Sequence, residues 1–165
     1  MTRPTRSLCV APEHRYVRNE SSDPTAIRSL AVTTADVVAA LETNLTTGRR
    51  AVLRVTPPFS GRMRARLHLD QGVDGEHSET TASPIHIDPA RLVADPPAYP
   101  RAVETEAALR RDPAESYTVD RHHERHAEAV EQWRQRVPER IRDRIALETP
   151  GGSHDVAIQT LERDL

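Results

Sequence analysis

The chain has 165 residues, enough for one domain with a modest core, and a formal net charge of −2 at pH 7. This balance excludes a strongly basic nucleic-acid-binding protein, and no apolar run approaches the ~18 residues that a membrane helix needs. The start, Met1–Arg6, carries basic residues without an apolar stretch behind them, so we expect no secretory signal and a soluble, cytoplasmic protein.

Arginine supplies all 23 basic residues. Codon bias in a GC-rich genome explains this usage, and the surface chemistry of salt-loving archaea is a second explanation compatible with the first. Cys9 is the single cysteine, so neither an internal disulfide nor a thiolate zinc site is expected.

The first regular elements are predicted to follow a disordered extension. Residues 1–26 show no periodicity and form that extension, whereas residues 27–165 form a single domain. Leu30–Val32 is expected to be a short strand. Thr33 or Thr34 then caps a helix, because an acid follows in the first turn and apolar residues recur at helical spacing, at Val37, Val38, Leu41 and Leu45.

Two alternating runs follow, and they give the clearest structural pattern in the chain. Residues 51–55 and 63–69 place apolar side chains at every second position, and the turn Pro57–Gly61 joins them. This pattern predicts a β-hairpin with one buried face. The buried residues are expected to be Ala51, Leu53, Val55, Met63, Ala65, Leu67 and Leu69.

The middle of the chain is expected to be largely irregular. Residues 71–83 are polar and are predicted to form a long loop. A short strand then buries Ile85 and Ile87, and Asp88 caps a short helix that begins at Pro89. Three prolines within residues 94–100 exclude regular structure there.

A long helix and a second hairpin are predicted at the end of the chain. Thr118 is the expected cap, and Pro138 ends or kinks the helix. One continuous apolar stripe is expected at Val119, His123, His126, Val130, Trp133 and Val137. Strands around Ile145–Leu147 and Val156–Ile158 flank turn residues. The whole pattern predicts an α+β fold: an antiparallel sheet of about five or six strands, including two hairpins, against one long and one shorter helix.

The strongest candidate surface is the basic face of the predicted hairpin. Guanidinium groups at period two on an exposed strand suit an acidic partner protein or phosphates. The alternative is a solvated face whose arginines pair with Asp88, Glu148 or Asp155. Nucleic acid is less favoured because the face lacks stacking aromatic residues. The predicted partner-binding residues are Arg54, Phe59, Arg62, Arg64 and Arg66.

Histidines give a second candidate. His122 and His126 are four residues apart and are the predicted metal ligands, although their place at the edge of the helix stripe also fits histidines at a core rim. His68 and His86 each precede an aspartate by two residues, a spacing that places an imidazole and a carboxylate on one strand face. No nucleophile elbow or phosphate-binding glycine loop is present, and no cofactor is predicted.

The segments Leu53–His68 and Trp133–Leu161 resemble small uncharacterised proteins of haloarchaea, over about residues 27–162. The resemblance implies no activity. The sequence therefore predicts a non-enzymatic protein-binding module. The alternatives are a metal-binding protein or metal-dependent enzyme that uses the histidines, and, third, a nucleic-acid-associated protein.

Overall fold

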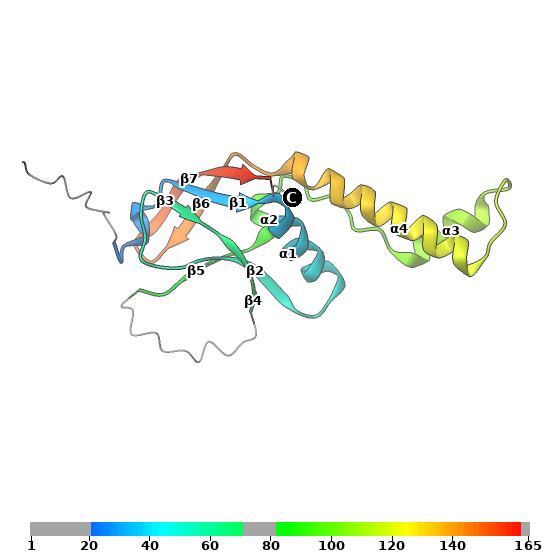
Figure 1. Cartoon of the computed structure of the whole chain (residues 1–165), viewed down its shortest axis with the longest axis horizontal. Helices are drawn as coiled ribbons and strands as arrows, with labels where there is room; N and C mark the ends of the chain where they lie inside the picture. Colours follow the sequence, from blue (N-terminus) through cyan, green and yellow to red (C-terminus); the bar gives the residue numbers. More distant parts are fainter. Residues whose placement is uncertain (1–20, 71–81, 163–165) are drawn as a thin grey trace, which may run out of the picture.

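A computed structural model describes residues 21–70 and 82–162 (Figure 1). The α+β class expected from the sequence is confirmed. The strands are β1 (Ser29–Thr33), β2 (Arg50–Val55), β3 (Arg62–Arg64), β4 (Arg66–Asp70), β5 (Ile85–Ile87), β6 (Arg144–Thr149) and β7 (Gly152–Leu161). The α-helices are α1 (Thr34–Thr46), α2 (Pro89–Leu92), α3 (Ala102–Arg111) and α4 (Val119–Arg136). Two short 3₁₀ helices are η1 (Pro24–Ala26) and η2 (Pro138–Arg140).

The strands form two sheets where one antiparallel sheet was predicted. The first has the order β3-β1-β7-β6, in which β1 runs parallel to both β3 and β7 and only β6–β7 is antiparallel. The second has the order β4-β2-β5 and is antiparallel throughout. The β6–β7 hairpin is therefore confirmed, whereas the single antiparallel sheet is wrong.

The alternating run at residues 62–70 is shared between the sheets. Its first half, β3, pairs with β1, and its second half, β4, pairs with β2. Between them Ala65 is fully buried, and its amide donates to the Ala31 carbonyl at 3.0 Å. The predicted hairpin thus exists only as the β2–β4 pair, because the chain leaves one sheet for the other at Ala65.

α1 begins as predicted, but its packed face is shorter than predicted, because Leu45 is 52% exposed. The Thr33 hydroxyl accepts a hydrogen bond from the Asp36 amide at 3.2 Å, which caps the helix. Its buried face presents Val37, Ala40 and Leu41 to the core, and the inward residues of β2, Ala51, Leu53 and Val55, are fully buried beneath it.

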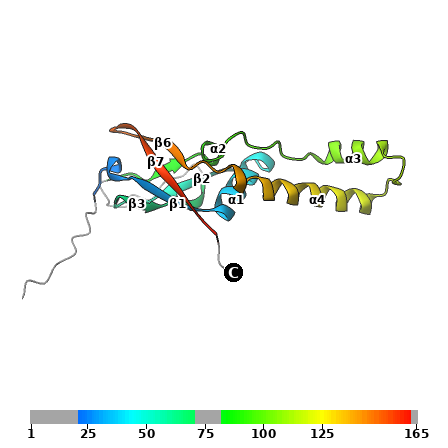
Figure 2. The ribbon, with the colours of Figure 1, turned by 90° about the horizontal axis from the view of Figure 1, so that it is seen from above.

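α3 and α4 form an antiparallel arm that projects from the body (Figures 1 and 2). α3 was not predicted. The Thr118 cap of α4 is confirmed by a hydrogen bond from the Arg121 amide at 3.1 Å. The continuous buried stripe is wrong: Val130, Trp133 and Val137 are buried, but Val119 is 59% exposed. The first half of α4 lies beyond the sheets, where its described neighbours are α3 and the connection between the two helices.

Regular structure begins earlier than predicted, within the segment that was assigned to the N-terminal extension. Ser21 pairs with Phe59, and Pro24–Ala26 forms η1, so these residues are ordered although they were assigned to the extension. The predicted disorder of residues 1–20 and the predicted loop over residues 71–81 lie outside the described residues. Within those described, no helix is both long enough and apolar enough to cross a membrane.

Candidate functional site

The outer face of the three-stranded sheet gathers arginine and histidine side chains from all three strands. Arg54 on β2 lies opposite Arg66 on β4 and His86 on β5. His68 lies two residues beyond Arg66, and residues two apart on a strand share a face. Arg64 joins them from the end of β3. We call this surface the Arg–His face: Arg54, Arg64, Arg66, His68 and His86.

A shallow cavity of about 430 Å³ lies on this face. Arg64 and Arg66 are exposed at it, and Arg54 is half-buried between the two outer strands. The residues that line the cavity are Arg54, Thr56, Met63, Arg64, Arg66, Leu67 and His68. The cavity therefore offers three guanidinium groups and an imidazole within one concave surface.

Two buried polar atoms on the face have no hydrogen-bond partner among the described residues. They are Nε of Arg54 and Nε2 of His86. The rings of His68 and His86 stack with centroids 5.8 Å apart, and Val52, between them on β2, is 1% exposed. A buried polar atom without a partner costs free energy, about 1–3 kcal/mol. Each such atom in a folded protein calls for a physical explanation, of which an ordered water or a bound ion is one.

The acids suggested as partners for the strand arginines are engaged elsewhere or lie on the other sheet. The Asp88 side chain accepts from the Ala90 amide at 2.9 Å and so caps α2, as predicted. Glu148 lies 3.5 Å from Arg91, and Asp155 is on β7. Within the described residues, Arg54, Arg64 and Arg66 form no ion pair, whereas Asp70 lies 3.9 Å from Arg50. The Arg–His face thus carries uncompensated positive charge.

The other two predicted partner-binding residues do not line this cavity. Arg62 is exposed at the start of β3, where it lies opposite Ser29 of β1. Phe59 is fully buried in the core, and its backbone pairs with that of Ser21. Phe59 therefore lies outside the Arg–His face, and with His86 it lines a separate cavity of about 540 Å³.

His122 and His126, the predicted metal ligands, hold the arm together. The Nε2 of His122 donates to the Ala102 carbonyl at 2.8 Å, so this nitrogen is not free for a metal. The Nδ1 of His126 lies 3.3 Å from the Thr105 hydroxyl, and the two rings are 6.3 Å apart. In residues 21–70 and 82–162, no three His, Cys, Asp or Glu side chains come together as a metal site would require.

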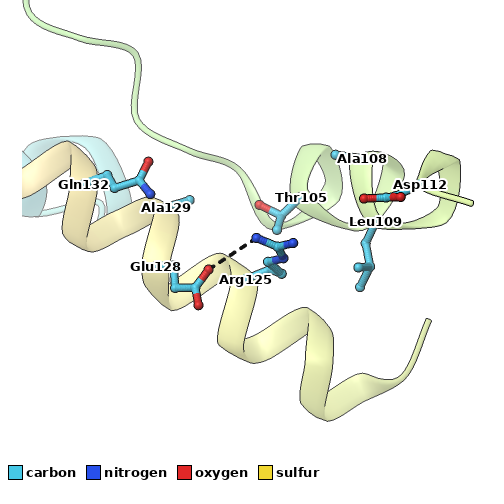
Figure 3. Close-up of a pocket in the computed structure, with 8 residues that line it drawn as sticks. All are labelled: Thr105, Ala108, Leu109, Asp112, Arg125, Glu128, Ala129 and Gln132. Atoms are coloured by element: carbon cyan, nitrogen blue, oxygen red, sulfur yellow. Dashed lines mark ion pairs between the residues drawn. The ribbon is translucent and has the colours of Figure 1, made fainter. Parts of the chain in front are cut away.

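The arm contains a second cavity, of about 260 Å³, between α3 and α4 (Figure 3). Its charged residues compensate one another in part, since Arg125 and Glu128, both on α4, lie 3.6 Å apart. The residues that line it are Thr105, Ala108, Leu109, Asp112, Arg125, Glu128, Ala129 and Gln132. This cavity lacks the concentration of one charge that marks the Arg–His face.

Glu115 fastens the tip of the arm. Its carboxylate accepts from Arg121 at 2.6 and 2.8 Å and from Arg125 at 2.7 Å. These two guanidinium groups, Arg121 first, lower the pKa of Glu115 from 4.5 to about 2. Arg121 and Arg125 are thus committed to the structure of the arm.

His86 belongs to the Arg–His face but was not among the predicted partner-binding residues. The sequence does indicate its orientation, because His86 stands between the two inward residues of a short strand, Ile85 and Ile87. What the sequence alone lacked was the pairing of that strand with β2, which brings His86 opposite Arg54.

A family model described as a domain of unknown function (DUF8009) matches residues 17–162. No match of significance was found among curated proteins, and none among solved structures. The matched residues cover both sheets, α1 and the arm. The chain therefore belongs to this family of uncharacterised domains.

Proposed function

We propose that this DUF8009 domain is a non-enzymatic binding module whose Arg–His face docks an acidic segment of a partner protein. The observation that carries the proposal is the group of three arginines without an ion pair among the described residues, set around one cavity. Guanidinium groups bind carboxylates in a bidentate manner.

The partial burial of Arg54 makes this face more selective for anionic ligands than a fully solvated row of arginines. Arg54 is half-buried between strands and lies directly opposite Arg66 of β4. Like charges held this close repel one another, and an anionic ligand relieves that repulsion. A carboxylate-rich segment therefore gains more here than on an isolated surface arginine.

The test uses binding of a fluorescein-labelled oligoglutamate peptide, followed by fluorescence anisotropy. Arg64 and Arg66 are reversed together to glutamate, and Arg142 and Arg144, also exposed and two residues apart, are reversed in a matched control. The first variant is expected to weaken binding at least tenfold, about 1.4 kcal/mol, and the control to leave it nearly unchanged.

Both variants should melt at the wild-type temperature, because all four side chains are exposed. Equal weakening in both variants would show that general charge, rather than this face, attracts the peptide. Tighter binding of a single-stranded oligothymidylate of equal charge, lost in the Arg64 and Arg66 variant, would reassign the face to nucleic acid.

A further inference from the structure

His68 is the only imidazole among the described residues that line the cavity of the Arg–His face. The three guanidinium groups of that cavity keep their charge throughout the physiological range of pH. Imidazole is the side chain whose chemistry places a change of charge between about pH 5 and 8. The positive charge that this cavity offers to a ligand therefore varies with pH through one residue.

Strand pairing and a ring stack hold His68 at the cavity. The residue lies opposite Val52 in the pairing of β4 with β2, so its side chain belongs to the outer face of the sheet. Its ring stacks on that of His86 with centroids 5.8 Å apart and an interplanar angle of 28°. The stack spans β2, because β4 and β5 pair with the two sides of that strand.

The basic groups that face His68 come from three strands. Arg66 lies two residues before it on β4, and residues two apart on a strand share a face. Arg54 of β2 and Arg64 of β3 line the same cavity. His86 of β5 adds the second ring, whose Nε2 is buried. A carboxylate that enters the cavity thus meets the imidazole of His68 together with the arginines.

Asp70 is the acid that shares the outer face of β4 with His68. Its carboxylate lies 3.9 Å from the guanidinium group of Arg50, which is its partner in the strand pairing, so Asp70 is already engaged. It does not line the cavity, whereas His68 does. The acid that meets His68 inside the cavity is therefore a carboxylate of the ligand.

We propose that the proton on His68 controls how tightly the Arg–His face holds an acidic segment, with tighter binding at mildly acidic pH. This inference rests on the proposed function and specifies the regulation of its site. A carboxylate interacts more favourably with an imidazolium than with a neutral imidazole, so the binding of a proton and the binding of the ligand reinforce each other. By the same linkage, the bound ligand raises the fraction of His68 that carries a proton.

The first test measures the affinity for the fluorescein-labelled oligoglutamate peptide from pH 6 to pH 8, a range in which glutamate stays ionised. The wild type is expected to bind about tenfold more tightly at pH 6 than at pH 8. His68→Gln keeps a polar side chain without a titrating group, so its affinity should be flat over this range. The control His123→Gln, at an exposed position of α4, should retain the full pH dependence.

The second test counts protons by calorimetry at pH 7 in buffers of different ionisation enthalpy. The wild type is expected to take up a fraction of a proton for each peptide bound, and His68→Gln none. A purely structural role of His68 would leave this uptake unchanged. The wild-type measurement needs no substitution, so it decides the matter even if His68→Gln lowers the melting temperature.

The outcomes separate the proton switch from the docking site itself. An affinity without pH dependence, or binding without proton uptake, would overturn the switch, and the docking site would stand if the Arg64 and Arg66 variant still lost binding. Full pH dependence in His68→Gln would assign the proton to another group and also overturn it. Absence of peptide binding at every pH would refute the proposed function.

Discussion

Glu42 on α1 connects three parts of the molecule through one carboxylate. It accepts from Nε and Nη2 of Arg134 at 3.0 and 2.9 Å, and from the Tyr99 hydroxyl at 3.0 Å. Tyr99 in turn packs edge-on against Trp133, with ring centroids 5.0 Å apart. The hydrogen bonds from Arg134 hold the pKa of Glu42 below its usual 4.5. This carboxylate therefore joins the base of the arm to the body.

Glu42→Gln is expected to lower the free energy of unfolding by about 1 kcal/mol at neutral pH, because Arg134 is half-exposed and solvent screens the pair. A lowered pKa in the folded state means that the contribution is complete above about pH 4.5 and is lost as the pH falls through the lowered value. Urea unfolding at neutral and acidic pH measures this difference. Equal effects of Glu42→Gln and of the exposed control Glu139→Gln would refute the role of Glu42.

At the scale of elements, the arm depends on its tip as well as on its base. α3 and α4 bury few large side chains between them, chiefly Leu109 and Val130. Glu115, in the connection between the helices, binds Arg121 and Arg125 of α4. Polar contacts thus carry much of the pairing between the two helices.

Glu115→Gln should therefore increase amide hydrogen exchange in α3 and in the first turns of α4, without affecting the sheets. In the wild type the same change is expected on acidification, since the pKa of Glu115 is lowered to about 2 and its stabilising effect fades below about pH 4.5. Hydrogen exchange with mass spectrometry measures both. Unchanged protection in the variant, or a change equal to that of the exposed control Glu131→Gln, would argue against the clamp.

Local patterns predicted individual elements better than their pairing. The caps at Thr33, Asp88 and Thr118 are read from a few neighbouring residues, and all three are confirmed. α3 was missed because its single buried residue is Leu109, so no apolar stripe marks it. The stripe on α4 was extended too far because a regular spacing does not reveal where the body of the protein ends.

The sequence predicted only part of the candidate site, because residue spacing along the chain is local whereas strand pairing is not. Alternation along residues 62–70 predicts that Arg64 and Arg66 lie on one side of the chain, and both line the same cavity although they belong to different strands. The parallel pairing of β1 with β3 is a long-range contact that no local pattern encodes. For this reason the sequence could not show that Arg62 lies outside the cavity or that Phe59 is buried.

At the scale of the whole molecule, the Arg–His face lies where the two sheets share one run of chain. The crossing at Ala65 ends the first sheet at β3 and starts the second at β4. It places Arg64 at the end of one sheet and Arg66 at the start of the other, on the same cavity. The arm projects from the body at α4 and supplies none of the residues of this cavity (Figure 2). The Arg–His face and the arm are therefore structurally separate.

The central claim is that acidic ligands bind at the Arg–His face, and mapping of backbone amide chemical shifts tests it most directly. The ¹⁵N-labelled full chain is titrated with an oligoglutamate peptide. We predict that the largest shifts fall on β2, β4 and β5, with the arm unaffected. Shifts concentrated on α3 and α4, or spread evenly over all exposed arginines, would contradict the account.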